Sequence, residues 1–344
     1  MVKKYILFVM GNPLLDIQVK ADENLLEKYG LKPNDSILAE EKHMPLYVEI
    51  VKNYKPTYVA GGAAQNTARG AQYLLPPNAT IYVGCVGNDH LGKQLRMAAE
   101  KDGLCVEYMV VDDVATGTCA ALLTDHKRSL VANLSAAEKY QLSDLKSPEK
   151  WKHVENAEYF YISGFFLTVS VPSALEVAKH ASEKNKVFSM NLSAPFLAQF
   201  FTKDLDALSP YWDLIFGNEN EAEAFAKAHA WEHEEIKQIA LAIAQLPKIN
   251  TKRQRVVVIT QGADPTIVAY PDGTIKEYPV IAIADDEIVD TNGAGDAFVG
   301  GFLSQYVQGK SIEESVAAGH WLANINVKQI GATYPEEKIA FVPK

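Results

Sequence analysis

Residues 290–302 read Asp-Thr-Asn-Gly-Ala-Gly-Asp-Ala-Phe-Val-Gly-Gly-Phe, a glycine-rich turn that leads directly into an apolar stretch with helical character. Because Gly293 and Gly295 lack a Cβ, the backbone there can come close to a ligand. The free N–H groups of the first helical turn would point outward, at the positive end of the helix dipole. This stretch therefore predicts a helix start that holds an anion such as phosphate.

Asp296 lies at the mouth of this predicted anion site. A carboxylate beside an anion is a poor choice for binding alone, but it suits a general base that takes the proton from an attacking hydroxyl. We therefore predict that Asp296 is the catalytic base and that the amides of Gly293, Ala294 and Gly295 form the anion hole. The alternative is an ordinary helix start with glycines for close packing.

Short apolar runs bounded by turn residues recur along the rest of the chain, at residues 6–10, 80–86, 159–163, 187–191, 214–216 and 255–260. Continuous runs of this length are typical of strands buried on both faces. Segments of helical period lie between them, such as the stripe Ile236, Ile239 and Ile243. This alternation predicts an α/β fold with a doubly wound, mostly parallel central sheet flanked by helices.

Two stretches break the alternation, residues 16–62 and 112–137. The first is polar and rich in turns. The second contains an apolar run that ends in the turn His126-Lys127-Arg128, which is typical of a β-hairpin. Together they predict a small β-rich lid domain. The predicted large α/β domain, which binds nucleotide and carries the catalytic groups, comprises residues 1–15, 63–111 and 138–344.

The composition limits the class of protein. The chain has 344 residues, of which 48% are hydrophobic and 22% charged, so it can bury a large core and is not globally disordered. Its net charge of −10 argues against a nucleic-acid partner, and no apolar stretch approaches the ~20 residues of a membrane span. Cys85, Cys105 and Cys119 form no CxxC pair, which predicts reduced thiols in the cytoplasm.

The full string at 290–296 resembles the signature of the ribokinase-like (PfkB) family of sugar and nucleoside kinases. Residues 61–66, Gly-Gly-Ala-Ala-Gln-Asn, resemble the family's sugar-binding motif, and residues 218–221, Asn-Glu-Asn-Glu, resemble its Asn-x-x-Glu motif. The second resemblance implies that Asn218 and Glu221 organise Mg²⁺ and phosphate through water, for which few direct ligands suffice. Taken alone, each motif is equally compatible with a loop or a polar helix start.

Longer blocks resemble the members of this family that phosphorylate adenosine, at residues 11–17, 31–35, 163–170, 191–196, 216–219 and 252–255. The resemblance implies transfer of the γ-phosphoryl group of ATP to the 5′-hydroxyl of adenosine in purine salvage. It implies Mg²⁺ as cofactor, with a monovalent cation as a further candidate, and adenosine and ATP as partners. We expect a cytoplasmic monomer, with the nucleus as an alternative location.

The same resemblance implies the residues of the site. An adenine pocket closed by the lid would be walled by Leu14, Leu38, Cys119, Leu134, Phe166 and Phe196. The other implied adenosine contacts are Asn12, Asp16, Gly62, Ala63, Asn66 and Asn292. The implied ATP contacts are Asn218, Thr260, Gly262, Asn292, Gly293, Gly295, His320 and Asn324. Arg128 would reach the transferring phosphoryl group as the lid closes; the alternative for it is a solvated turn.

Two alternative functions stay open at this point. The chain could be a ribokinase-like kinase for a sugar or for a different nucleoside, or a nucleoside-binding protein that kept the fold without catalysis. The intact Asp296 and glycine turn argue against the second. Residues 252–255, Lys-Arg-Gln-Arg, are interpreted as a solvated turn before a strand, with a nuclear localisation patch as the alternative.

Overall fold

The computed structural model describes residues 6–33, 35–124, 127–232 and 235–343. Its central sheet has nine strands in the order β14-β13-β12-β11-β10-β9-β1-β5-β6, and all neighbours are parallel except β13 and β14, which join antiparallel at one edge. The strands are β1 (Leu7–Met10), β5 (Thr80–Gly87), β6 (Cys105–Val111), β9 (Tyr159–Ser163), β10 (Val187–Asn191), β11 (Leu214–Asn218), β12 (Val256–Gln261), β13 (Asp264–Ala269) and β14 (Ile275–Tyr278). The predicted buried strands are confirmed.

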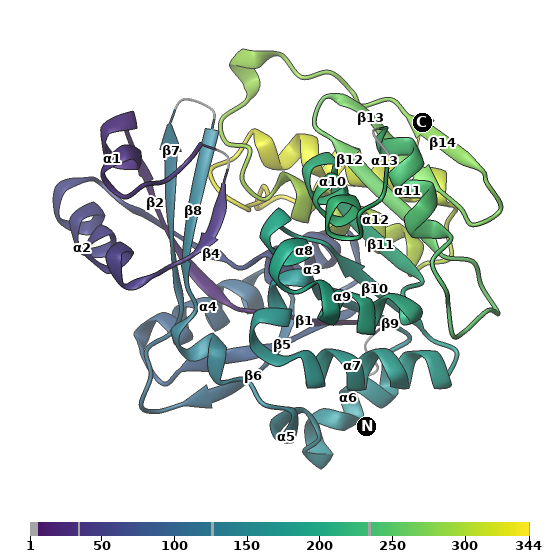
Figure 1. Ribbon diagram of the computed structural model, residues 1–344. Helices are drawn as coiled ribbons and strands as arrows, with labels where there is room; N and C mark the ends of the chain where they lie inside the picture. Colours follow the sequence, from purple (N-terminus) through teal and green to yellow (C-terminus); the bar gives the residue numbers. More distant parts are fainter. Residues whose placement is uncertain (1–5, 34, 125–126, 233–234, 344) are drawn as a thin grey trace.

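Helices cover both faces of this sheet (Figure 1). Successive side chains of β1 show why, because Leu7 and Val9 belong to one core and Phe8 and Met10 to another. The first core is covered by α3 (Ala63–Leu74), α4 (His90–Lys101), α12 (Ala294–Tyr306) and α13 (Ile312–Val327). The second is covered by α5 (Leu142–Leu145), α6 (Pro148–Asn156), α7 (Leu167–Glu183), α8 (Pro195–Phe200), α9 (Thr202–Leu208), α10 (Glu219–Ala228) and α11 (Ile236–Ala244). The predicted doubly wound α/β fold is confirmed.

A second sheet of five strands stands beside the large one, in the order β3-β8-β7-β2-β4 (Figure 1). Its strands are β2 (Leu14–Lys20), β3 (Ser36–Leu38), β4 (Thr57–Gly61), β7 (Thr118–Thr124) and β8 (Lys127–Asn133). The predicted hairpin is present as the antiparallel pair β7 and β8, although His126 of its turn lies outside the described residues. We refer to this sheet with its two helices, α1 (Glu23–Lys28) and α2 (Met44–Asn53), as the lid sheet.

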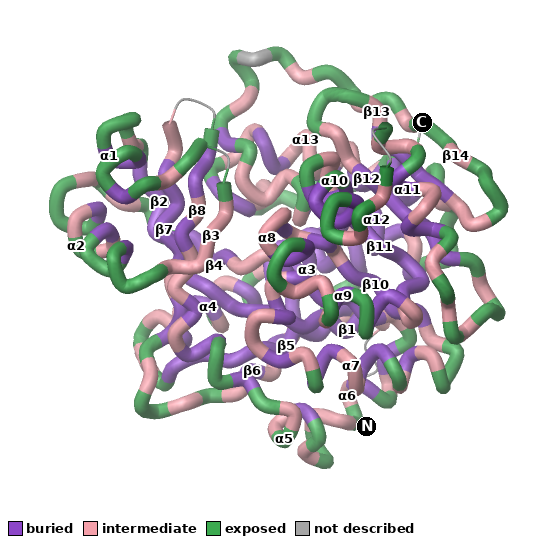
Figure 2. Tube along the Cα trace, viewed as in Figure 1, coloured by how far each residue is buried: buried purple, intermediate pink, exposed green. Residues whose placement is uncertain are grey.

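The two faces of the lid sheet have different roles. Ile17, Val19 and Leu122 point to the face that α1 and α2 cover. Leu14 and Cys119 point to the opposite face, toward the large domain. Figure 2 shows the buried interior of both sheets and the exposed outer surface of α1 and α2. None of the helices in the described part of the chain has the length and apolar character needed to cross a bilayer.

Arg255 corrects the interpretation of residues 252–255 as a solvated turn. Lys252 is exposed, but Arg255 is 0% exposed. Its guanidinium donates hydrogen bonds to the backbone carbonyls of Ser209, Trp212, Ile243, Ala244, Leu246 and Pro247. One buried side chain therefore ties the ends of α9 and α11 to the start of β12.

Candidate active site

The glycine turn before α12 has the geometry of an anion site. Gly293 has φ +76, and a Cβ there would lie 2.7 Å from the Cβ of Ala332, so the position requires glycine. The Ala294 amide, which the sequence also assigned to the anion hole, instead donates to Thr291 O at 3.3 Å. Among the described residues, no hydrogen bond is found for the N–H groups of Gly293, Gly295 or Asp296. These unbonded amides at the start of a 13-residue helix can receive an anion.

Gly295 offers a direct test of this site. A Cβ built on Gly295 meets nothing within 4 Å, so Gly295→Ala should leave the free energy of unfolding unchanged or slightly higher. The added methyl group would stand where the anion approaches, and we expect kcat/KM for ATP to fall by about 10²-fold. As a matched control in the same helix, Gly300→Ala places its Cβ 2.8 Å from the carbonyl oxygen of Thr67 and should destabilise the fold. Unchanged kcat/KM in Gly295→Ala would contradict the assignment.

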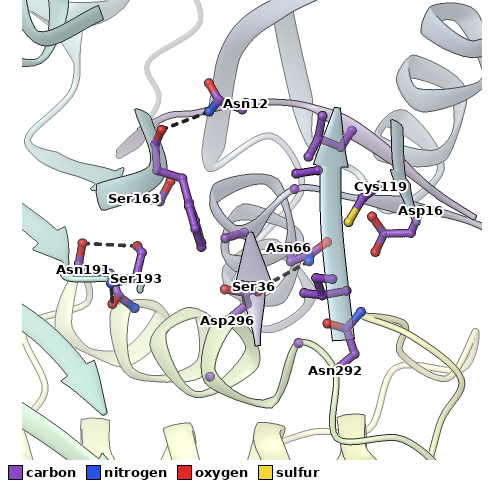
Figure 3. Close-up of a pocket in the computed structure, with 18 of the residues that line it drawn as sticks. Asn12, Asp16, Ser36, Asn66, Cys119, Ser163, Asn191, Ser193, Asn292 and Asp296 are labelled. Carbon is purple, nitrogen blue, oxygen red and sulfur yellow. Dashed lines mark hydrogen bonds between the residues drawn. The ribbon is translucent and has the colours of Figure 1, made fainter. Parts of the chain in front are cut away.

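A cavity of about 240 Å³ opens in front of this turn, bounded by α12, the carboxyl ends of β1, β9 and β10, and the inner face of the lid sheet (Figure 3). It brings together many residues singled out in the sequence: Asn12, Leu14, Asp16, Leu38, Gly62, Ala63, Asn66, Cys119, Leu134, Glu221, Asn292, Gly293, Gly295 and Asp296. It also contains residues that the sequence did not indicate: Ser36, Ile37, Leu130, Ala132, Ser163, Phe165, Asn191 and Ser193. Ser163 and Asn191 had one available signal, since each ends a predicted parallel strand.

Asp296 is held by a partner from a distant helix. Asn66 on α3 donates from Nδ2 to Asp296 Oδ2 at 3.0 Å. The carboxyl group of Asp296 is enclosed by the cavity, and this burial raises its pKa to about 7 against the lowering effect of Asn66. A carboxylate with a pKa near 7 is better matched to proton abstraction from a hydroxyl than an ordinary one.

Other polar groups of the cavity, on Asn12, Asn66 and Asp16, are available to form hydrogen bonds with a ligand. Asn12 donates from Nδ2 to Phe165 O at 3.1 Å, and Asn66 donates to Asp296. The side-chain oxygens of both asparagines are buried without a partner among the described residues. Asp16 is buried too, and burial raises its pKa to about 7 although the Arg128 charge opposes the shift. Buried acceptors of this kind are satisfied by ligand or water, and hydroxyl groups of a sugar would serve.

Three carboxyl groups that line the cavity, Asp16, Glu221 and Asp296, have pKa values of about 7, in each case chiefly because burial disfavours the charged form. Their ordinary values are 3.8 and 4.5, so between about pH 4 and pH 7 the folded chain binds more protons at these groups than the unfolded chain. Their contribution to stability is therefore present at low pH and is lost as pH rises through 7. The control is the triple variant Asp16→Asn, Glu221→Gln, Asp296→Asn. We expect the urea midpoint of the ligand-free wild type minus that of the variant to decrease from pH 5 to pH 8. An increase would contradict this.

Two predicted walls of the adenine pocket need correction. Phe166 is 0% exposed and packs edge-on against Tyr140, with ring centroids 5.5 Å apart, so it belongs to the core of the large domain. Its neighbour Phe165 lines the cavity instead, because the short helix Gly164–Phe166 turns successive side chains in different directions. Phe196 is absent from the lining and lies behind it, with its ring centroid 6.1 Å from that of Phe165.

Arg128 also differs from expectation in the conformation described. It is buried on β8, so it is not a solvated turn residue, and it does not line the cavity. Its guanidinium binds Asp290 through Nε, at 3.0 Å, and through Nη2. Asp290 further accepts hydrogen bonds from Gln18 Nε2 at 3.0 Å, Asn292 N at 2.9 Å and Gly331 N at 2.7 Å. Asp290, the first residue of the glycine-rich string, therefore joins the lid sheet to residues 291–296, which we call the anion turn.

Of the residues implied for ATP, Asn292, Gly293 and Gly295 line the cavity, and the other five lie outside it. Asn218 and Thr260 are paired at the carboxyl ends of β11 and β12, and Gly262 forms the turn after β12 with φ +58. His320 on α13 is hydrogen-bonded to Thr266 Oγ1 at 2.8 Å, and burial lowers its pKa to about 4, so it is neutral near pH 7. Asn324 is half-buried one turn further along the same helix.

Asn218 and Glu221 form a capping box at the start of α10. Asn218 Oδ1 accepts from Glu221 N at 2.9 Å, and Glu221 Oε2 accepts from Asn218 N at 3.0 Å. In the described part of the chain, no group of three or more His, Cys, Asp or Glu side chains is placed to hold a metal ion directly. The buried Glu221 carboxylate, which reaches the cavity, fits a hydrated Mg²⁺ that takes its other ligands from water and phosphate.

A family model described as pfkB family carbohydrate kinase matches residues 23–339. The chain belongs to the pfkB family. Among its relatives in this family, adenosine kinase 2 of Arabidopsis thaliana is 50% identical over 333 residues, which are 96% of each chain. Adenosine kinase of Schizophyllum commune is 49% identical over 338 residues, 97% of this chain and 98% of the relative.

Solved structures of the family have the same fold. Adenosine kinase of Anopheles gambiae in complex with P1,P4-di(adenosine-5) tetraphosphate is 44% identical, with a TM-score of 0.95, over 97% of this chain and 99% of that one. Adenosine kinase of Schistosoma mansoni in complex with 2-fluoroadenosine is 39% identical, with a TM-score of 0.94, over 97% and 98%. The predicted family membership and fold class are thus confirmed.

Proposed function

We propose that this chain is an adenosine kinase, which transfers the γ-phosphoryl group of ATP to the 5′-hydroxyl of adenosine and yields AMP and ADP in purine salvage. The observation that carries the proposal is the position of Asp296, which lies beside unbonded backbone amides in a cavity with an apolar wall. Two relatives named adenosine kinase are 50% and 49% identical to this chain over 96% and 97% of its length, which supports adenosine as the substrate.

Each part of adenosine has a matching part of the cavity. The ribose diol is bound by Asp16, which accepts hydrogen bonds from hydroxyl groups, and by Asn12. The adenine lies against the lid face formed by Leu14 and Cys119, with Phe165 opposite. A flat apolar slot with an aromatic face suits a purine.

In the chemical step, Asp296 accepts the proton of the 5′-hydroxyl as the oxygen forms its bond to the γ-phosphorus. The bond from that phosphorus to the β,γ-bridging oxygen breaks, and ADP leaves with the electron pair. The free amides of Gly293, Gly295 and Asp296 stabilise the charge on the transferring phosphoryl group, since donors that are already oriented need no reorganisation. Most of the acceleration therefore comes from positioning and electrostatics.

At the ATP end, we assign the phosphates to the anion turn and the nucleoside to the surface that carries Thr260, Gly262, His320 and Asn324. Asn218 and Glu221 would hold Mg²⁺ through water. Mg²⁺, when bound, neutralises phosphate charge. ADP release measured in potassium and in tetramethylammonium salts tests whether a monovalent cation is required.

We also propose that residues 16–62 and 112–137 act as a lid domain that closes over adenosine and excludes water from the transferring phosphoryl group. Arg128, on this lid, would exchange Asp290 for phosphate during closure. We expect a monomer located in the cytoplasm, which size-exclusion chromatography and cell fractionation would test.

An ADP-release assay across nucleosides and pentoses tests the function. We expect kcat/KM for adenosine to exceed that for inosine, ribose and fructose by about 10²-fold or more, because buried polar groups left unpaired by a wrong substrate are costly. Preference for ribose or fructose would favour a sugar kinase of the same family. Adenosine binding without ADP release would favour a non-catalytic nucleoside-binding protein.

A further inference from the structure

A second cavity, of about 560 Å³, lies in the seam between the lid sheet and the large domain. The lid sheet contributes the ends of β2 and β7 and the turn before β4, and the large domain contributes residues 288–290 and Ile330. The connection from β14 to α12 runs back toward the lid strands to form this side (Figure 1). None of its lining residues lines the active-site cavity, so the seam cavity is a separate compartment.

The charges of the seam cavity favour an anion. Lys20 and Lys55 both line it, both are exposed, and no ion pair is found for either among the described residues. The acidic residue in the lining, Asp290, is already neutralised by Arg128. Two unpaired lysines on a chain with a net charge of −10 form a local positive site.

The rest of the wall favours an apolar or aromatic body on that anion. Tyr54, Leu123, Val289 and Ile330 line the cavity together with the lysines. Ligand pockets typically measure about 300–1,000 Å³ and combine an apolar lining with a few polar groups, and the seam cavity falls within that range. A nucleoside monophosphate has both the dianionic group and the flat apolar ring that this wall would accommodate.

Gln18 connects this cavity to the active site. It is 6% exposed, and its Nε2 donates to Asp290 Oδ2 at 3.0 Å. Its Oε1 is buried without a hydrogen-bond partner in the described part of the chain, and an orphaned acceptor at a cavity wall is where a ligand or water completes the bonding. Asp290 in turn accepts from Asn292 N of the anion turn. A ligand that moves Gln18 would therefore change the hydrogen bonds of Asp290 and, through them, the position of the anion turn.

We propose that the seam cavity binds a nucleoside monophosphate such as AMP, with its phosphate between Lys20 and Lys55 and its base on the Tyr54 wall. A ligand there contacts both domains, so it holds the lid sheet against the large domain and slows turnover. The proposed binding of AMP is argued from the cavity alone, whereas the proposed effect on turnover rests on the proposed kinase function. AMP is the product of that reaction, so the seam would act as a product sensor.

Calorimetry on the full chain with its active site filled tests binding. Diadenosine tetraphosphate, with which the Anopheles gambiae relative forms a complex, is added at saturation to fill the catalytic site, and AMP is then titrated. We expect one further AMP per chain, and about tenfold weaker binding in Lys20→Ala/Lys55→Ala. The matched control Lys52→Ala removes an exposed lid lysine that lies outside the cavity and should bind like wild type. Inorganic phosphate and adenosine serve as probes of each half of AMP and should each bind more weakly.

Kinetics separates the regulatory effect from the function itself. At saturating adenosine and ATP, AMP should lower kcat of the wild type, and the double lysine variant should lose this inhibition while its kcat without AMP changes by less than about twofold. No second AMP in the blocked protein, binding unaffected by the double substitution, or phosphate binding as tightly as AMP would overturn the proposal. Absence of ADP release without AMP would instead overturn the kinase function.

Discussion

Asp296→Asn is expected to lower kcat for ADP release by about 10²–10⁴-fold, because the amide cannot accept the proton of the 5′-hydroxyl. Adenosine binding should stay close to wild type, since the amide has the same shape and its oxygen can still accept the hydrogen bond from Asn66 Nδ2. An ADP-release assay should show this decrease in turnover, and calorimetry should show that adenosine binding is retained. Near wild-type turnover would contradict the role of Asp296.

Asp16→Asn is the matched control for that substitution. Both carboxyl groups line one cavity and have pKa values of about 7, but we place only Asp296 at the reacting hydroxyl. Asp16→Asn should therefore act mainly through KM for adenosine, and Asp296→Asn through kcat. Because a general base acts in its ionised form, wild-type kcat/KM should fall as pH decreases below about 7. Equal effects of both substitutions on kcat would show that the two roles are not separate.

Arg255→Leu is expected to lower the free energy of unfolding by about 4 kcal/mol or more, enough to leave much of the protein insoluble. The substitution removes the Arg255 donors from six backbone carbonyls. Ser209 O and Ile243 O keep a backbone donor, and the other four are left without one among the described residues. A buried acceptor that loses its partner costs about 1–3 kcal/mol. Urea titration monitored by tryptophan fluorescence would report the loss, since Trp212 supplies one of the accepting carbonyls and is fully buried.

Lys252→Ala is the matched control from the same basic run, because Lys252 is exposed. It should change the free energy of unfolding by less than about 0.5 kcal/mol. Arg255→Lys should fall between the two, since an ammonium group has three donors against five in a guanidinium. A stability of Arg255→Leu equal to that of Lys252→Ala would show that the carbonyls find other partners.

Much of the fold followed from local patterns. The predicted strand 159–163 is β9 to the residue, and the predicted strand 187–191 is β10, because continuous apolar runs between turn residues leave little choice where a parallel sheet is buried on both faces. The anion turn could likewise be predicted from its glycines, since the conformational freedom of Gly293 and the free amides of a helix start are properties of the local backbone.

Other features depend on partners far away in the chain. Phe165 and Phe166 are identical side chains in adjacent positions, yet one lines the cavity and the other fills the core. The pair formed by Arg128 and Asp290 joins residues 162 positions apart, and the hydrogen bond from Gln18 to Asp290 joins residues 272 apart. No periodicity in the sequence reports such a contact.

By itself the sequence determined where strands lie, where the backbone turns to expose its amides, and which carboxylate stands beside them, because these depend on neighbouring residues. Only the tertiary structure decided which aromatic ring faces the ligand, that Arg255 is interior, and that Asp290 ties the lid to the anion turn. The physical reason is that burial and hydrogen-bond partnership are set by how distant elements pack, and one residue type can occupy a wall, a core or a surface with equal local propensity.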